Sequence, residues 1–533
     1  MTQGLLAASS SEVAREAARR RTFAVISHPD AGKSTLTEAL ALHAQVIGQA
    51  GAVHGKGERR GVVSDWMAME QQRGISITSA ALQFAYRDVV VNLLDTPGHA
   101  DFSEDTYRVL TAVDCAVMLL DAAKGLEPQT LKLFEVCRRR RIPVITFINK
   151  WDRPGQDPLA LLDEIEQRIG LKPTPLNWPV GIAGQFHGVV SRSTGTMTRF
   201  ERTPGGAGRA IEEELTAQQA AGRYGDDWAR AGEELELLAM TGADHDKATF
   251  EAATSTPVMF GAAVANFGVR QLLDVLAEMA PAPVARPDTG GTARPLDAGF
   301  SGFVFKIQAN MNRAHRDQVA FIRVCSGKFE RGMVVVNGAT GRPFTTKYAQ
   351  QIFGRDRETI DEAYPGDVVG LVNATALGIG DTMYAGPPVR YPPLPSFPPE
   401  HFAVVRAVDS STFKRFRRGI EQLDAEGVVQ VLRSDARGDQ APVLAAVGPM
   451  QFEVATHRLG AEFGVPTELQ HLPYEIARRT DPAGRETLRG KPGIEVFTRV
   501  RDDTLLALFP NPWRLRSISL ENPRLVLDDV LMS

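Results

Sequence analysis

The 533-residue sequence predicts three domains: an α/β domain built on a parallel sheet, an antiparallel β-barrel and an α+β domain. In the first half of the chain, short apolar runs alternate with helical patterns. In the region that follows, apolar residues recur at every second position, and two proline clusters separate the three regions. The expected boundaries are 1–20 for an N-terminal helical extension, 21–283 for the α/β domain, 284–297 for a linker, 298–390 for the barrel, 391–399 for a second linker and 400–533 for the α+β domain.

Four apolar runs are expected to form buried strands of the parallel sheet, with helical stretches between most of them. These runs are Thr22 to Ser27, Val89 to Leu94, Ala116 to Leu120 and Val144 to Ile148. That order favours helices on both faces of the sheet. The stretch over about 176–255 is rich in Gly, Thr and Glu, so we interpret it as an insertion.

Beyond the first linker, Phe303, Phe305 and Ile307 alternate with other residues, and turns centred on Gly327 and Gly332 follow. This pattern is typical of a small antiparallel barrel. After the second linker the expected order is strand, helix, two strands and helix, which indicates a ferredoxin-like α+β unit. The ranges are 402–406, 413–424, 428–432, 443–447 and 450–463.

Composition excludes several classes of protein. Lys and Arg number 60 against 64 Asp and Glu, so a nucleic-acid partner would have to meet local basic patches rather than a global field. Cys115, Cys137 and Cys325 are not spaced as a metal site, which favours a reduced, cytoplasmic chain. Neither a signal peptide nor a membrane-spanning run is visible, and we expect no membrane and no DNA partner.

A phosphate-binding loop is predicted between the first strand and the first helix. Backbone N–H groups of such a loop hold phosphates at the positive end of the helix. Lys33 would reach the β- and γ-phosphates, and Ser34 would offer its hydroxyl to Mg²⁺. Taken alone, the segment fits an ordinary strand-to-helix turn about equally well, since Ser27 replaces the usual first glycine. The predicted loop consists of Ser27, His28, Pro29, Asp30, Ala31, Gly32, Lys33, Ser34 and Thr35.

A second segment follows the strand that ends at Leu94. Asp95 at this strand end can hold Mg²⁺ through water, and the N–H of Gly98 can meet the γ-phosphate. Alone, the segment would be interpreted more simply as a Pro-Gly turn. It consists of Asp95, Thr96, Pro97, Gly98 and His99.

A third segment follows the strand that ends at Ile148 and contains Asn149, Lys150, Trp151 and Asp152. The Asp152 carboxylate can accept from both N1–H and the 2-amino group of guanine, a pair of donors that adenine lacks. Backbone N–H groups of Gly261, Ala262 and Ala263 would donate hydrogen bonds to the guanine O6, although the composition of this segment is common in unrelated proteins.

Each of the three segments follows the carboxyl end of a strand in one parallel sheet, and open α/β folds bind ligands at these strand ends. Their order along the chain is phosphate, Mg²⁺ and γ-phosphate, then base, which predicts a P-loop GTPase that uses GTP, GDP and Mg²⁺.

The same residues resemble the translational GTPases. The segment from Arg73 to Thr78 is similar to their switch I, and Asp95 to His99 with Asp101 and Phe102 is similar to their switch II. The resemblance implies that Ser76, which stands where the family has Thr, binds Mg²⁺ together with Ser34 and Asp95; Thr78 is the alternative. It also implies that His99 is catalytic alongside Lys33, either as a base or by orienting water.

Further segments resemble the class II peptide-chain release factors, the release factor three family. They are Phe102 to Arg108, His315 to Phe321, Glu426 to Val431 and Val447 to Phe452. This resemblance implies a three-domain factor that binds the ribosome, both its RNA and its proteins, and uses GTP to help a class I release factor leave after peptide release. An elongation factor G-like protein is the alternative, although about 130 residues after Pro399 leave little room for its further domains.

One charged segment has two open interpretations. Phe413, Lys414, Arg415, Phe416, Arg417 and Arg418 interleave aromatic and basic residues on a predicted helix. In the simpler interpretation both Phe pack on the sheet and the charges form a solvated face. In the sharper one the Phe stay in the core while Lys414, Arg415 and Arg418 face ribosomal RNA phosphates.

Overall fold

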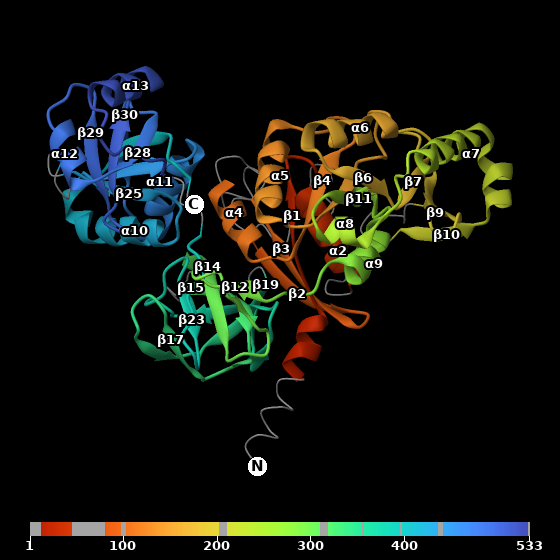
Figure 1. Ribbon diagram of the computed structural model, residues 1–533, viewed down its shortest axis with the longest axis horizontal. Helices are drawn as coiled ribbons and strands as arrows, with labels where there is room; N and C mark the ends of the chain where they lie inside the picture. The colour runs from red at the N-terminus through yellow and green to blue at the C-terminus, as the bar shows by residue number, and fades with distance from the viewer. Residues whose placement is uncertain are drawn as a thin grey trace, which may run out of the picture.

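The computed structural model describes residues 12–44, 80–97, 103–201, 210–309, 318–353, 356–394, 397–434, 437 and 441–530. In Figure 1 the α/β domain and the blue C-terminal domain lie side by side above the green barrel. None of the helices in these ranges is long and apolar enough to span a membrane.

The α/β domain is built on a seven-stranded sheet in the order β2-β3-β1-β4-β5-β11-β6. Its strands are β1 (Arg20–Ser27), β2 (Ala80–Tyr86), β3 (Val89–Asp95), β4 (Cys115–Asp121), β5 (Val144–Asn149), β6 (Lys172–Pro175) and β11 (Ser255–Phe260). The four predicted strands are present and mutually parallel. The prediction of a wholly parallel sheet is wrong in one respect, because β2 runs antiparallel to β3. The turn of Arg87 and Asp88 between them is too short for a parallel crossover.

Helices cover both faces of this sheet, as predicted. One face carries α4 (Ser103–Thr111), α5 (Pro128–Arg140) and α6 (Pro158–Ile169), and the other carries α2 (Lys33–His43) and α9 (Val269–Met279). Their apolar faces pack on the buried strands, which fixes the strand ends where the predicted loops begin.

The predicted insertion is a small subdomain at one end of the α/β domain (Figure 1). It contains an antiparallel sheet of β7 (Asn177–Val180), β8 (Gly188–Ser191), β9 (Met197–Glu201) and β10 (Ile211–Leu215), followed by α7 (Ala217–Met240) and α8 (Lys247–Glu251). Helix α7 begins with a capping box in which Thr216 and Gln219 satisfy each other's backbone N–H.

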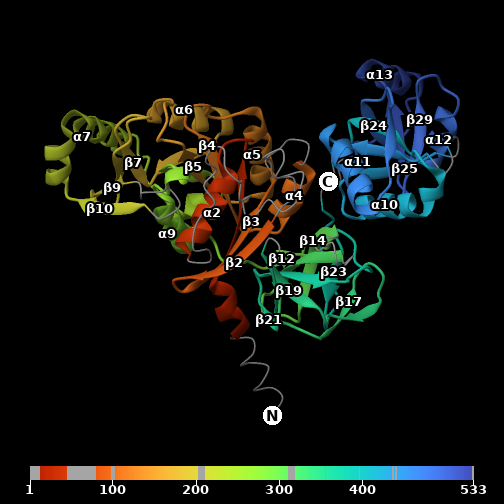
Figure 2. The same cartoon turned by 180° about the vertical axis from the view of Figure 1, so that it is seen from behind.

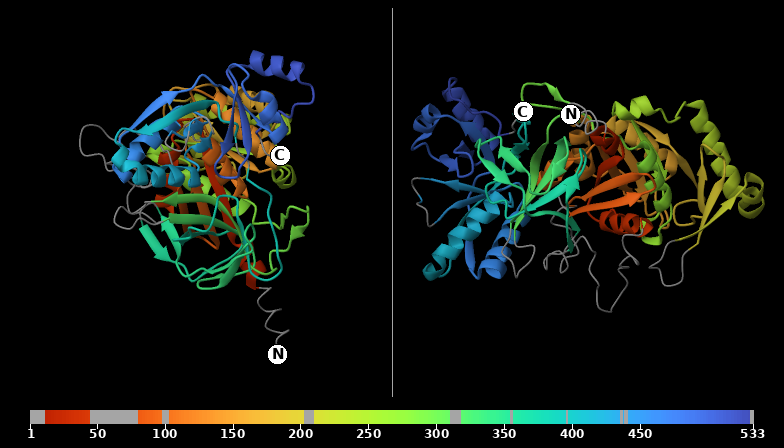
Figure 3. Two further views of the ribbon diagram at one scale, coloured as in Figure 1. Left: turned by 90° about the vertical axis from the view of Figure 1, so that its left-hand side faces the viewer. Right: turned by 90° about the horizontal axis from the view of Figure 1, so that it is seen from below.

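The second domain is an eight-stranded antiparallel sheet with edge strands β18 and β20. Figure 3 shows this sheet curled into a half-barrel. Its strands are β14 (Ser301–Ala309), β15 (Gln318–Ser326), β17 (Val334–Asn337), β18 (Pro343–Thr345), β19 (Ala349–Phe353), β20 (Asp356–Thr359), β22 (Val368–Val372) and β23 (Thr382–Tyr384). Two short hairpins accompany them, β12 (Arg286–Pro287) with β13 (Ala293–Arg294), and β16 (Phe329–Glu330) with β21 (Glu362–Ala363).

Strand β14 departs from simple inside-outside alternation, because all of its residues are buried. Val304 and Ile307 face the barrel core, whereas Phe303 and Phe305 belong to the apolar core shared with the α/β domain. The α/β domain therefore covers the outer face of the strand.

The third domain begins with the predicted ferredoxin-like order. Its elements are β24 (His401–Ala407), α10 (Phe413–Ala425), β25 (Gln430–Arg433), β26 (Val443–Ala446), α11 (Met450–Phe463) and β27 (Thr467–His471). The sheet order β27-β24-β26-β25 is that of a split βαββαβ unit. Beyond β25 the sheet continues through β29 (Glu495–Arg499), β30 (Leu505–Phe509) and β28 (Ile476–Thr480), with helices α12 (Pro482–Leu488) and α13 (Pro512–Glu521).

Candidate nucleotide-binding site

The predicted phosphate loop joins β1 to α2. Gly32 is the N-cap of α2 with φ of 98°, and the cap has no side-chain hydrogen bond. The first turn also carries no acidic residue. Among the described residues, neither a capping side chain nor a first-turn carboxylate occupies the positive end of the helix, which suits an anionic ligand. Gly32 is also required sterically, because a Cβ there would lie 2.5 Å from Nδ2 of Asn149.

Lys33, the first residue of α2, and Asp95, the last residue of β3, form a buried ion pair. Lys33 Nζ lies 2.7 Å from Asp95 Oδ1, and the two residues are 6% and 2% exposed. Such an ammonium group neutralises a carboxylate that would otherwise be costly to bury. A bound Mg²⁺–phosphate group would satisfy Asp95 in its place and leave Lys33 to the phosphates. The carboxylate of Asp95 and the hydroxyl of Ser34 are hard oxygen donors of the kind that Mg²⁺ prefers.

The segment that follows Asp95 is held on both sides. Thr96 donates its hydroxyl to the Val25 carbonyl at 2.8 Å, and Thr106 of α4 donates to the Pro97 carbonyl at 3.3 Å. The remaining switch candidates, Gly98, His99, Ser76 and Thr78, lie outside the described residues, as does the rest of the segment from Arg73.

Asn149, in the base loop, links that loop to two other segments of the site. Its Nδ2 donates to the Ala31 carbonyl at 2.8 Å, and its Oδ1 accepts from the Ala263 N–H at 2.8 Å. The side chain is 2% exposed. One buried amide thus joins the phosphate loop, the base loop and the segment after β11.

Lys150 adds a second connection between the base loop and the phosphate loop. It has φ of 66°, and its Nζ donates to the Asp30 carbonyl and to Asp121 Oδ2, the latter at 2.8 Å. Burial raises the pKa of Asp121, but the hydrogen bonds from Lys150 and from the Ala123 N–H outweigh it, so this pKa lies below its ordinary value. The Asp121 carboxyl is therefore ionised at neutral pH.

The side chains of Trp151 and Asp152 extend from the base loop in different directions. Trp151 is fully buried and packs edge-on against Phe260 at 5.0 Å between ring centroids, within the core of the insertion. Asp152 is partly exposed and lies just beyond the carboxyl end of β5. The buried indole thus anchors the backbone from which Asp152 extends.

The segment Gly261 to Ala263 lies beside the base loop as expected, but its amides have other tasks. They donate to the Ile148 carbonyl at 3.0 Å, the Phe267 carbonyl at 3.0 Å and Asn149 Oδ1 at 2.8 Å. These bonds brace the base loop. A contact from this segment to guanine O6 stays a prediction, and it requires one of these donors to be shared.

Two residues of the site were not predicted from the sequence. Asp121 ends β4, at the same sheet edge as Asp95 and Asn149. Glu127 precedes α5 and places Oε2 2.8 Å from Nδ1 of His28, the phosphate-loop histidine. The strand-end position of Asp121 was a usable signal, whereas nothing local in the sequence pairs Glu127 with His28.

Three protein families match successive parts of the chain. Residues 18–282 match the elongation factor Tu GTP binding domain, 299–386 match elongation factor G domain 2, and 391–519 match the C-terminal domain of class II release factor RF3. A crystal structure of a protein from Thermus thermophilus shares the fold, with a TM-score of 0.68 at 22% identity over 87% of this chain and 69% of that one. The predicted fold class is therefore confirmed.

Curated relatives cover nearly the whole chain. Peptide chain release factor 3 of Synechocystis is 49% identical over 95% of this chain and 94% of its own. Peptide chain release factor 3 of Gloeobacter violaceus is 48% identical over 98% of this chain and 99% of its own. The resemblance seen in the sequence is confirmed. The chain therefore belongs to the peptide chain release factor 3 family of translation-termination GTPases.

Proposed function

We propose that this GTPase binds the ribosome after peptide release, is activated there, and promotes dissociation of a class I release factor, with hydrolysis of GTP to GDP and phosphate. The observation that carries the proposal is the match of residues 391–519 to the class II release factor C-terminal domain, behind a domain whose three nucleotide loops converge. It favours this function over the elongation factor G-like alternative. The working compartment is then the cytoplasm.

Different residues of the site have different roles in binding and hydrolysing GTP. Lys33 binds the β- and γ-phosphates, the amides of Ser27 to Thr35 surround them, and Asp152 selects guanine. Ser34, Ser76 and, through water, Asp95 hold Mg²⁺, which neutralises developing charge on the phosphates when bound. His99 orients the attacking water or accepts its proton.

Activation by the ribosome follows if the water-orienting group is not positioned in the free protein. The covalent step is small in phosphoryl transfer, so positioning and electrostatics determine the rate. A partner that places His99 against the water would raise turnover without adding a catalytic group of its own.

The test is GTP hydrolysis by the full chain, measured with and without ribosomes, with Lys33→Ala as the inactive control. The proposal predicts slow hydrolysis alone, stimulation by ribosomes, and loss of both rates in the control. Equal rates with and without ribosomes would overturn ribosome activation, and full activity of Lys33→Ala would overturn the site.

A further inference from the structure

Helix α10 carries four exposed cations in five consecutive positions around a buried aromatic residue. Lys414, Arg415, Arg417 and Arg418 are exposed, whereas Phe416 is 1% exposed. Phe413 packs partly buried against the same core, with its ring centroid 6.3 Å from that of Phe416. The prediction that both aromatic residues belong to the core is therefore confirmed, and they fix the direction in which the cations point.

Arg415 has a structural task that separates it from its neighbours. Its Nη1 donates to the Phe463 carbonyl at 3.3 Å, at the last turn of α11. A cation at a helix C-terminus is favourable, because it meets unsatisfied carbonyls and the negative end of the dipole. Arg415 thus ties α10 to α11, and the sequence-based grouping of Arg415 with Lys414 and Arg418 is not kept.

Lys414 and Arg418 have no such task. Neither forms a hydrogen bond or an ion pair with any residue in the described part of the chain, whereas Arg417 lies 3.5 Å from Glu421. Their spacing of four residues places both on one face of the helix.

The position of these two cations is also unfavourable for the helix. Lys414 lies in the first turn of α10 and Arg418 in the second, and the first turn has no acidic residue. Positive charge near a helix N-terminus opposes the macrodipole, at about 0.3–1 kcal/mol per charge in the first turn. Stability of the fold therefore does not explain these two charges, and their exposed position leaves them accessible to an external partner.

The exposed face of α10 carries cations without large apolar side chains, which indicates an anionic partner that binds through charge rather than through apolar contacts. No large hydrophobic side chain of α10 is exposed, since Phe416, Ile420 and Leu423 are buried and Phe413 is partly buried. Protein interfaces usually centre on buried aromatic or aliphatic anchors, whereas RNA phosphates require only cations.

We propose that Lys414 and Arg418, with Arg417 beside them, contact phosphates of ribosomal RNA. This inference rests on the proposed ribosome binding and deepens it by assigning a surface. The third domain would then contribute affinity through a helix remote from the nucleotide site, without altering nucleotide binding.

The experiment compares the full chain with Lys414→Gln/Arg418→Gln. Ribosome affinity is measured with a non-hydrolysable GTP analogue at about 50 and 200 mM salt, and binding to a fluorescent RNA hairpin is measured by anisotropy. Loss of two phosphate contacts predicts weaker binding to both, and a slope of log K against log salt that is shallower by roughly 1.4–1.8. The melting temperature should be unchanged or higher, because the helix dipole is relieved.

Two controls make the outcome decisive. Arg489→Gln/Arg516→Gln removes the same charge from the C-cap of α12 and from α13, which pack in a core separate from that of α10, and should leave the salt slope unchanged. Arg415→Gln should lower the melting temperature, because the contact with α11 is lost. Unchanged affinity and slope, an equal effect of the remote control, or a lower melting temperature of the double variant would each overturn the assignment. Loss of hairpin binding in a chain that does not bind ribosomes would uphold the surface and overturn the proposed function instead.

Discussion

At the scale of single residues, the site depends on side chains that connect loops rather than fill space. Asn149 joins the phosphate loop to the segment after β11, and Lys150 joins the base loop to Asp121. Each uses a buried or partly buried polar group whose partners come from distant parts of the chain. Removing one partner leaves another unsatisfied, which usually costs about 1–3 kcal/mol.

The carboxylate of Asp152 is predicted to select the base. Asp152→Asn should weaken GTP binding by at least about tenfold, because hydrogen bonds to a charged group contribute about 1.5–3 kcal/mol. The variant should gain relative affinity for xanthine nucleotides, which carry an oxygen in place of the 2-amino group. Titration with labelled GTP and XTP measures both effects, and a variant that binds GTP like the parent would show that Asp152 does not read the base.

His99 is predicted to act in the chemical step. His99→Ala should retain nucleotide and ribosome binding but slow ribosome-stimulated hydrolysis by at least about tenfold, since a group that orients water or moves a proton is lost. Single-turnover hydrolysis on saturating ribosomes measures this step separately from binding. An unchanged rate would assign His99 a structural role.

At the scale of elements, α4 connects the nucleotide site to the third domain. It follows the segment that contains Asp95, and Figure 2 shows it on the side of the α/β domain that faces the C-terminal domain. Tyr107 of α4 contacts Phe397 at 4.2 Å between ring centroids, and Arg108 pairs with Glu104 while lying against Gly427. We therefore predict that a displacement of α4 is transmitted to the turn between α10 and β25.

Gly427 tests this connection. It has φ of 70°, and a Cβ there would lie 2.3 Å from Nη1 of Arg108. Gly427→Ala should destabilise the chain through backbone strain of about 1 kcal/mol and, in addition, displace Arg108 and raise hydrogen exchange in α4. The matched control is Gly490→Ala, since Gly490 has φ of 73° with nothing within 4 Å of its Cβ position. Equal exchange in α4 of the two variants would refute the coupling.

The sequence predicted the elements whose signal is local. The strands that became β1, β3, β4 and β5 are apolar runs, and each was placed within two residues of its ends. Strand β6 was missed because its four residues include two prolines, which disfavour a strand interior. The role of Glu127 and the continuation of the third sheet through β28 to β30 depend on contacts between distant segments, which periodicity cannot reveal.

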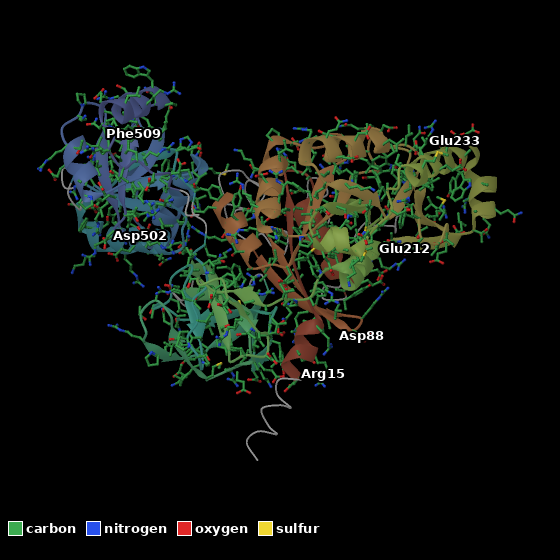
Figure 4. All side chains as sticks on the ribbon, viewed as in Figure 1. Arg15, Asp88, Glu212, Glu233, Asp502 and Phe509 are labelled. Atoms are coloured by element: carbon green, nitrogen blue, oxygen red, sulfur yellow. The ribbon has the colours of Figure 1, made fainter. Side chains whose placement is uncertain are left out.

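At the scale of the whole molecule, the α/β domain and the barrel are joined by buried ion pairs. Arg20 pairs with Asp367 at 3.2 Å and Arg323 with Asp114 at 2.5 Å, and all four residues are largely buried. The third domain meets the other two around a cavity of about 250 Å³. Glu104, Arg108, Asp381, Asp424, Arg501 and Asp502 contribute to its lining, and Figure 4 labels Asp502 on the lower side of the C-terminal domain.

This arrangement suggests how one nucleotide site serves a large factor. Charged and apolar contacts hold the barrel against the α/β domain, so we expect the two to move together. The third domain contacts them through α4 and the linker, and a polar cavity lies between the contacting surfaces. A change at the segment containing Asp95 would therefore alter the position of the third domain first.

We propose that guanine-nucleotide binding at this site drives dissociation of a class I release factor. The most direct measurement follows a labelled class I factor leaving post-release ribosomes after addition of this chain. With the parent, GTP should accelerate dissociation and XTP should not. With Asp152→Asn, XTP should restore the acceleration that GTP no longer gives. Dissociation that is unaffected by the chain, or that is accelerated equally by every nucleotide, would show that guanine-nucleotide binding at this site does not drive it.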